Sequence, residues 1–246
     1  MLKSLCIAFA TYSCIPTPRT EWDEQSLRYA ICFFPLIGAV IGALEYGWWL
    51  LAGLLDCSVL LRGAVAAALP LAVTGGIHAD GFCDTVDALS SRAPRERKLE
   101  ILKDSHAGAF AAIFFGLWLL LYFAGWSALD GRETVLCAAW GFVISRALSG
   151  LALNHWPHAR KQGMLRTVAD AGNKRAITVT MAVYLVLALV GLGLTSLWRG
   201  AAVVAVNALA FLWYRVMSQR QFGGVTGDLA GCFVTVAELV PPWCWP

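Results

Sequence analysis

Long apolar runs dominate the chain and alternate with polar connections. Six of them approach or exceed the roughly 18 residues that cross about 30 Å of hydrocarbon as a helix. They predict spans near residues 30–55, 59–77, 109–128, 134–153, 176–197 and 200–217, with a weaker one at 229–240. Pro241 and Pro242 stop the last run after about 12 residues, or roughly 18 Å of helix. The pattern therefore predicts an all-α, polytopic transmembrane helical bundle with six or seven spans, built as one domain over residues 1–246.

Composition agrees with a membrane protein. Of the 246 residues, 59% are hydrophobic and 14% are charged, whereas a soluble domain carries about 25% charged residues. The formal net charge of +3 is too small to indicate a nucleic-acid partner. The eight cysteines show no C-x-x-C spacing, so we expect neither a disulfide framework nor a zinc site.

The first residues resemble a signal peptide, with one Lys and a short apolar stretch. However, Ile15-Pro16-Thr17-Pro18 offers no cleavage site of the A-x-A kind. We therefore expect an uncleaved first helix that is partly buried or interfacial.

The basic residues predict the orientation in the membrane. Fifteen of the nineteen Lys and Arg residues fall in the segments 1–30, 78–108, 154–175 and 214–228. The connections at 56–62, 129–133 and 198–200 contain only Arg62, Arg132 and Arg199, and Arg146 lies inside a span. By the positive-inside rule, the N-terminus and the basic loops face the cytoplasm. These loops also contain most of the residues whose side chains could take part in catalysis, so we expect a reaction centre at the cytoplasmic face.

The most informative polar stretch contains three aspartates. In a helix from about Asp80, the carboxylates of Asp80, Asp84 and Asp87 stand at positions i, i+4 and i+7 and share one face. Like charges in this arrangement repel unless a cation lies between them. Mg²⁺ is the natural candidate, because it takes oxygen ligands and is usually bound together with substrate phosphates. The alternative is a solvated, acidic helix end with Asp80 as its cap.

Other polar residues are weaker candidates. Lys103 and Asp104 come just before a span, near the same boundary as the aspartates, whereas the rest of that basic segment is typical of an interfacial helix. Arg146 lies about 10 Å inside its span, where it needs an anionic partner unless it extends to the interface. Glu238 is an intramembrane candidate as well. We expect Glu45 to be structural or interfacial, and His155 and His158 to have ordinary loop roles.

A glycine-rich turn precedes the last apolar run. Gly223 and Gly224 let backbone N–H groups approach a ligand, and Thr226 and Asp228 follow at the start of the helix. By itself the turn is equally typical of a tight connection between spans.

At these residues the chain resembles the cobalamin synthase family over nearly its whole length. The stretch 74–87 is similar to the family's T-G-G-x-H-x-D-G-x-x-D-x-x-D core, and 97–105 to its R-x-L-E-I-M-[KR]-D-S. The stretch 160–164 resembles a loop of the form A-R-x-x-G-[LM], and 223–228 resembles G-G-x-T-G-D. These motifs follow one another in the family's order.

The resemblance implies a transferase of cobalamin biosynthesis in the bacterial cytoplasmic (inner) membrane. It implies that adenosylcobinamide-GDP and α-ribazole, or its 5′-phosphate, are joined with release of GMP by a Mg²⁺-dependent phosphoryl transfer. On this hypothesis, Asp80 and Asp84 bind the metal, and Asp87 binds it or acts as the general base. The expected substrate-binding residues are His78, Lys103, Asp104, Arg146, Gly223, Gly224, Thr226 and Asp228. Lys103 and Arg146 stabilise the leaving nucleotide, and the partners are the small-molecule substrates, membrane lipid and, as an open alternative, a second copy of the chain.

Other functions remain open from the residues alone. A CDP-alcohol phosphotransferase uses the same ionic chemistry, but its pattern requires Ala-Arg where Asp84-Thr85 stands. An Asp-rich prenyltransferase needs two separated acidic motifs, and here the second is the single Asp228. A transporter would line a conduit with its intramembrane charges, whereas these charges gather at one face.

Overall fold

The computed structural model describes residues 1–104, 106–160 and 164–239, and these residues are helical almost throughout. The helices are α1 (Leu2–Tyr12), α2 (Glu24–Leu27), η1 (Ala30–Phe33), α3 (Phe34–Leu54), α4 (Val59–Thr74), α5 (Ile77–Ser90), α6 (Arg95–Ile101), α7 (Ala109–Ala128), α8 (Arg132–His155), α9 (Met164–Ala171), α10 (Lys174–Thr195), α11 (Leu197–Met217), η2 (Ser218–Phe222) and α12 (Gly227–Leu239). The predicted all-α class is confirmed.

The described part of the structure has five candidate spans, or six if one bent helix pair counts as a span, and six is the lower of the two numbers predicted from the sequence. Five helical segments among the described residues are long and apolar enough to cross a membrane: Glu24–Leu54, Ala109–Ala128, Arg132–His155, Lys174–Thr195 and Leu197–Phe222. The pair α4 and α5 makes a sixth if it counts as one bent span. The weak seventh candidate, α12, has 13 residues, and the prolines expected to end it lie outside the described residues.

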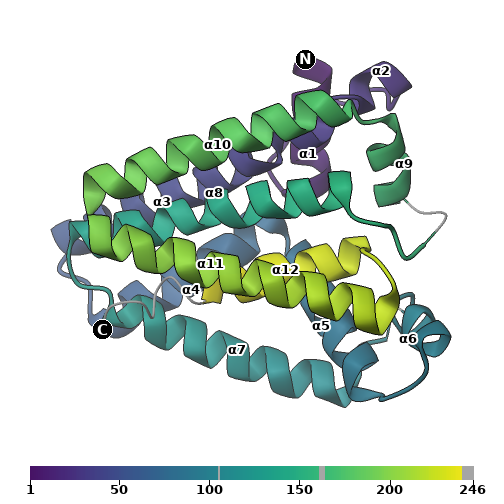
Figure 1. Ribbon diagram of the computed structural model, residues 1–246. Coiled ribbons are helices and arrows are strands. Elements are labelled where there is room, and N and C mark those ends of the chain that lie inside the picture. Colours follow the sequence, from purple (N-terminus) through teal and green to yellow (C-terminus); the bar gives the residue numbers. More distant parts are fainter. Residues whose placement is uncertain (105, 161–163, 240–246) are drawn as a thin grey trace.

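The spans run antiparallel and place all long connections at one end of the bundle (Figure 1). We call this the loop-rich end; it contains α1, α2, α6, α9 and the turn from η2 into α12. At the opposite end the spans are joined by short turns, at 55–58, at 129–131 and at Ser196. Residues 198–200 were expected to form this connection, but α11 already begins at Leu197 because Ser196 is extended and ends α10.

A sharp bend separates α4 from α5. Their axes differ by 93°, and the break is formed by Gly75 and Gly76, both with positive φ angles of 64° and 76°. Only glycine adopts this conformation without a steric penalty. The helix with the aspartates therefore starts at Ile77 and not near Asp80 as expected, and it lies almost at right angles to α4.

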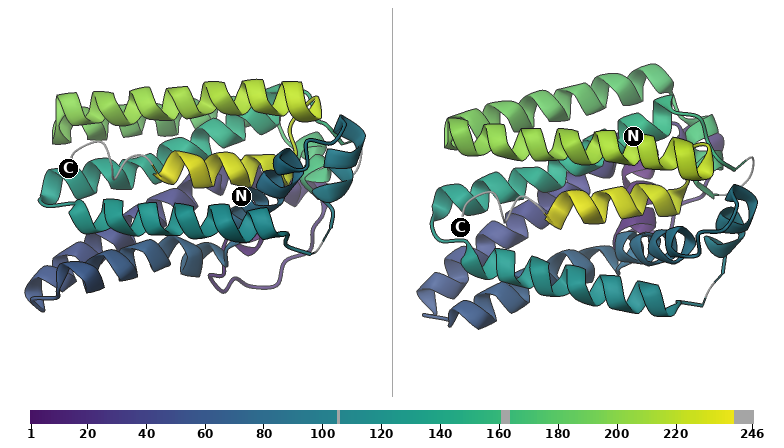
Figure 2. Two further views of the ribbon diagram at one scale, coloured as in Figure 1. Left: turned by 90° about the horizontal axis from the view of Figure 1, so that it is seen from below. Right: turned by 60° about the horizontal axis from the view of Figure 1, so that its bottom comes forward.

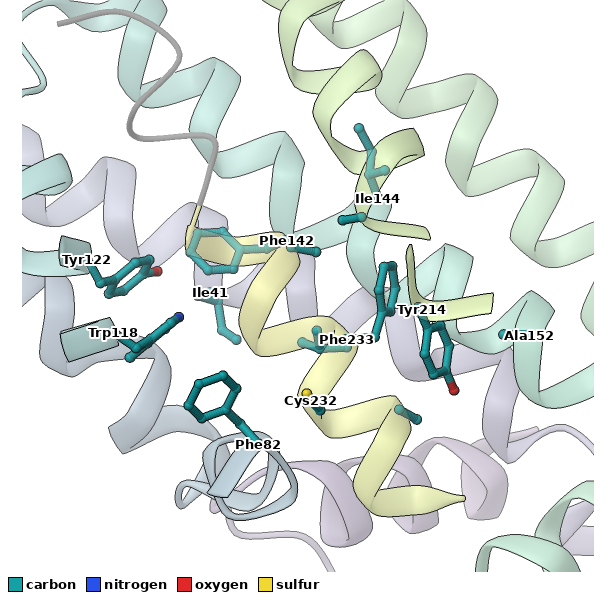
Figure 3. Close-up of a cluster of buried hydrophobic side chains, with 14 of the residues drawn as sticks. Ile41, Phe82, Trp118, Tyr122, Phe142, Ile144, Ala152, Tyr214, Cys232 and Phe233 are labelled. Carbon is teal, nitrogen blue, oxygen red and sulfur yellow. The ribbon is translucent and has the colours of Figure 1, made fainter. Parts of the chain in front are cut away.

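Helix α12 lies in the middle of the bundle. It starts at the loop-rich end and stops partway towards the other end, between α5, α7, α8 and α11 (Figure 2). Aromatic side chains from the surrounding spans gather around it, as shown for Trp118, Tyr122, Phe142 and Tyr214 (Figure 3). The Tyr214 ring stacks on Phe233 of α12 with 4.9 Å between centroids. The start of α12 is thereby held at the loop-rich end, beside α5.

Candidate active site

Two helices bring three aspartates together at the loop-rich end. Asp80 and Asp84 lie one turn apart on α5, and Asp228 stands at the start of α12, which packs along α5. The approach is close because of Gly81: a Cβ atom at this position would lie 2.6 Å from the carbonyl oxygen of Asp228. The third carboxylate of the site thus comes from a segment more than 140 residues later in the chain.

The electrostatics of this group favour a bound cation. Burial and, to a smaller extent, the neighbouring charges of Asp80, Asp228 and Asp87 raise the pKa of Asp84 from 3.8 to about 7, against an opposite effect of Arg160. Burial also raises the pKa of Asp228. Such shifts arise where carboxylates lack enough positive charge around them, and an all-oxygen donor set of this kind suits Mg²⁺. No three His, Cys, Asp or Glu side chains in the described part of the chain already stand at metal-binding separations.

Asp87 faces a different neighbour. Its Oδ2 accepts a hydrogen bond from the Gly108 N–H at 2.6 Å, and its Oδ1 accepts one from the Ala111 N–H at 2.9 Å. Asp87 therefore caps the first turn of α7, where backbone donors otherwise lack partners. This geometry ties α5 to α7 and leaves Asp80, Asp84 and Asp228 as the closest group of carboxylates.

A cavity of about 270 Å³ has Asp80 and Asp228 in its lining, whereas Asp84 and Asp87 do not line it. Its lining comes from α1, α3, α5, α8, α9, α12 and the 158–160 segment. The residues that line it are Thr11, Tyr12, Phe34, Ile77, His78, Asp80, Gly81, Ser149, Leu153, His158, Arg160, Val168, Val225, Thr226, Gly227, Asp228, Ala230 and Gly231. Part of the lining is apolar and aromatic, and part of it is charged.

Arg160 supplies positive charge to the cavity. Its Nη1 lies 3.2 Å from Oδ2 of Asp228, and its Nη2 donates to the Leu99 carbonyl oxygen at 3.2 Å. Its Nε is buried without a hydrogen-bond partner among the described residues. The guanidinium therefore links α6 to α12 and retains an unused donor.

The glycine-rich turn packs against protein, which differs from the expectation that its glycine N–H groups face a ligand. The N–H groups of Gly223 and Gly224 donate to the carbonyl oxygens of Gln219 and Ser218, and Val225 N–H donates to Pro157 at 2.8 Å. A Cβ at Gly224 would lie 2.4 Å from the Pro157 carbonyl oxygen, so the glycine permits this approach. The glycines shape the turn and do not themselves offer donors.

Donors are available one turn later. Thr226 Oγ1 accepts a hydrogen bond from Leu229 N–H at 3.2 Å and caps α12. The N–H groups of Gly227 and Asp228 have no partner within the described structure, and both residues line the cavity. The positive end of the α12 dipole thus points into the cavity.

His78 lies where the sequence predicts, in the lining of this cavity. It is buried against the Phe34 ring, with 5.6 Å between centroids, and its Nε2 lacks a hydrogen-bond partner among the described residues. Burial lowers the pKa of His78 well below its usual value, and the charge of Arg146 lowers it further. The imidazole is therefore neutral near pH 7.

Three predicted substrate-binding residues lie elsewhere. Lys103 and Asp104 are exposed between α6 and α7, and the Asp104 carboxylate accepts from the backbone and ring of His106. Arg146 is fully buried and forms an ion pair with Glu238, so a carboxylate and not a phosphate is its partner here. None of the three lines the cavity.

Sequence reasoning missed Arg160, Tyr12 and Ser149, and it gave His158 an ordinary loop role although His158 lines the cavity. A signal existed only for Arg160, which begins the 160–164 motif. Tyr12 and Ser149 lie in apolar helices, where nothing in the local pattern marks them. Burial raises the pKa of Tyr12 to about 12, so its hydroxyl stays protonated.

Comparisons with known proteins agree on one family. The family model described as cobalamin-5-phosphate synthase (CobS) matches residues 4–242. A protein of Lachnoclostridium phytofermentans named adenosylcobinamide-GDP ribazoletransferase is 45% identical, over 97% of this chain and 91% of the relative. Relatives with the same name from Pseudomonas syringae and Clostridium perfringens are 36% and 29% identical, over 88% and 96% of this chain and 87% and 94% of their own lengths. No solved structure matches the chain.

Proposed function

The chain belongs to the CobS family of cobalamin-5-phosphate synthases and is an adenosylcobinamide-GDP ribazoletransferase, and we propose that the cavity between α5 and the start of α12 is its active site. The observation that carries the proposal is the meeting of Asp80, Asp84 and Asp228 beside Arg160. Three other cavities in the described part of the chain, beside Glu45, His155 and Trp22, do not combine two carboxylates, a guanidinium and a helix N-terminus.

The reaction sets the chemical demands on this site. A ribose hydroxyl of α-ribazole, or of its 5′-phosphate, attacks the phosphorus next to the corrinoid, the bond to GMP breaks, and adenosylcobalamin or its 5′-phosphate forms. The hydroxyl loses its proton in this step, and negative charge grows on the phosphate oxygens. Catalysis of phosphoryl transfer therefore depends on positioning and on neutralising charge.

The three carboxylates would hold Mg²⁺. Asp84 is the central ligand in this proposal, because its charge is the least compensated, and Asp80 and Asp228 supply oxygens on either side. A bound ion would neutralise the diphosphate and orient it. The chain supplies few ligands, as is usual for Mg²⁺, which keeps waters and uses substrate phosphates.

Arg160 and the start of α12 would bind the phosphate groups. Without substrate, Arg160 is paired with Asp228. If Asp228 held a cation, this guanidinium would be free to bind a phosphate oxygen, for which its planar fork is suited. The partnerless N–H groups of Gly227 and Asp228 add donors at the positive end of the helix.

The apolar part of the lining would position an aromatic ring. Tyr12, Phe34 and Ile77 belong to this part, and a volume of about 270 Å³ suits a nucleoside portion but not a whole corrinoid. We propose that the corrinoid remains largely outside, towards the membrane surface.

The loop-rich end would face the cytoplasm of a bacterial cell. Fifteen of the nineteen Lys and Arg residues belong to segments that lie at this end, and the positive-inside rule assigns such loops to the cytoplasmic side. The multi-pass chain thus presents its site to substrates made in the cytoplasm.

The test uses purified protein in liposomes, given adenosylcobinamide-GDP and α-ribazole, with GMP release as the readout. Asp84→Asn should abolish Mg²⁺-dependent turnover, whereas Asp130→Asn, an exposed aspartate at the opposite end, should leave it unchanged. Wild-type turnover in Asp84→Asn, or full activity after removal of divalent ions, would disprove the assignment of the site.

A further inference from the structure

Four ionisable side chains meet in the middle of the bundle, away from the proposed active site. Glu45 of α3 is 1% exposed, Tyr122 of α7 and Arg146 of α8 are 0% exposed, and Glu238 of α12 is 7% exposed. None of them lines the cavity beside the aspartates. We call these four residues the central cluster.

The central cluster contains one complete ion pair. Arg146 Nη1 donates to Glu238 Oε1 and, at 3.1 Å, to the Phe142 carbonyl oxygen. Its other donors, Nε and Nη2, have no partner among the described residues. Only one of the three guanidinium nitrogens of Arg146 therefore has hydrogen-bond partners in the described structure.

Glu45 has no such partner. Both of its carboxylate oxygens are buried and accept no hydrogen bond in the described structure. The charge that acts on it most is the like charge of Glu238, and the Tyr122 hydroxyl feels both carboxylates. Arg62 of α4 lines the same small cavity as Glu45 but makes no ion pair with it. This cavity measures about 10 Å³, roughly the space of one water molecule.

The charges of the central cluster do not balance if every group is ionised. Two carboxylates and one guanidinium leave one uncompensated negative charge away from solvent. Arg62, which is partly exposed, makes no ion pair among the described residues that would offset it. An isolated buried charge costs several kcal/mol, and a carboxyl group in that position takes up a proton instead.

We propose that Glu45 is a buried proton-binding site, which carries no charge beside the Arg146–Glu238 ion pair. Glu238 is the ionised partner, because it accepts from Arg146, and Glu45 holds the proton, because nothing in the described structure stabilises its charge.

Infrared spectroscopy of the purified protein in detergent tests the proposal. At about pH 9, where the carboxyl group of Asp84 is ionised, the wild type should show the carbonyl band of a protonated carboxylic acid. Glu45→Gln should remove this band and retain wild-type thermal stability and GMP release, since glutamine has the shape and neutrality of the protonated acid. Glu238→Gln should retain the band and lower the unfolding temperature, because it leaves Arg146 without its carboxylate partner.

A double variant gives the matched comparison. Glu45→Gln combined with Glu238→Gln should unfold at the temperature of Glu238→Gln alone, because Glu45→Gln removes no interaction with Arg146. The proposal is overturned if the band persists in Glu45→Gln, or if Glu45→Gln unfolds or loses stability as much as Glu238→Gln. It is overturned as well if replacing Na⁺ by choline destabilises the wild type but not Glu45→Gln, since the site then binds a metal ion.

Discussion

Arg160 and Asp228 form an ion pair in the lining of the cavity, with 3.2 Å between Nη1 and Oδ2. Two spans, α10 and α11, separate Arg160 from Asp228 along the chain. In the proposed function, the two side chains pair with each other only until ligands bind. In the ligand-free protein, the ion pair avoids an uncompensated charge on either the guanidinium or the carboxylate in this partly buried position.

Replacing Arg160 should therefore impair turnover. Arg160→Ala should lower kcat/KM by about 10- to 100-fold, since one charge-assisted hydrogen bond to phosphate contributes about 1.5–3 kcal/mol. Arg160→Lys should recover part of the loss, because it keeps the charge but not the fork. Arg199→Ala is the control: Arg199 pairs with Glu133 at 2.6 Å at the opposite end, and its loss should leave GMP release unchanged. Equal effects of the two alanine variants would contradict a phosphate-binding role.

Asp87 should separate stability from catalysis. Asn keeps one of the two oxygens that accept from Gly108 and Ala111, so Asp87→Asn should retain part of the capping of α7 and most of the turnover. Asp87→Ala should lower the stability by about 1 kcal/mol, seen as a lower unfolding temperature in detergent. Abolished turnover in Asp87→Asn with unchanged stability would instead support the sequence-based assignment of Asp87 as a metal ligand or general base.

The metal-free protein should lose stability as the pH rises. The pKa of Asp84 is raised from 3.8 to about 7, so the folded state holds this proton more tightly than the unfolded chain. Stability then falls between these two values as the carboxyl group ionises. Thermal unfolding in the presence of a chelator should show this decline in the wild type and a shallower one in Asp84→Asn. Mg²⁺ should restore stability above pH 7 in the wild type only.

The approach of α5 to α12 should depend on Gly81. Gly81→Ala places a Cβ atom 2.6 Å from the Asp228 carbonyl oxygen, an overlap that costs about 1–3 kcal/mol or moves the two helices apart. Both unfolding temperature and turnover should fall. Gly116→Ala in α7 meets no atom within 4 Å and serves as the control. Unchanged turnover in Gly81→Ala would show that the spacing of the two helices does not matter.

The membrane-spanning helices could be predicted from the sequence, because the length of an apolar run determines whether a segment can cross a membrane. The run at 109–128 coincides with α7, and the shared helix of Asp80, Asp84 and Asp87 is present. Local pattern could not show which neighbour each carboxylate meets. Asp87 turns to α7 and Asp228 joins Asp84 only through the packing of distant helices.

Arg146 illustrates the same limit. It was expected inside a span and in need of an anion, and both expectations are confirmed. Its partner, Glu238, stands 92 residues away, and a single sequence contains no signal that joins two positions so far apart. The prediction of a phosphate partner was reasonable for an isolated cation, but the fold supplies a carboxylate first.

The bend at Gly75 and Gly76 affects how the site responds to the thickness of the membrane. Because α5 turns through 93° away from α4, its aspartates are spaced along a direction roughly across the spans and not along them. Thickening or thinning the bilayer tilts the long helices but changes little in the spacing of these carboxylates. We therefore expect turnover to vary little with the acyl-chain length of the lipid.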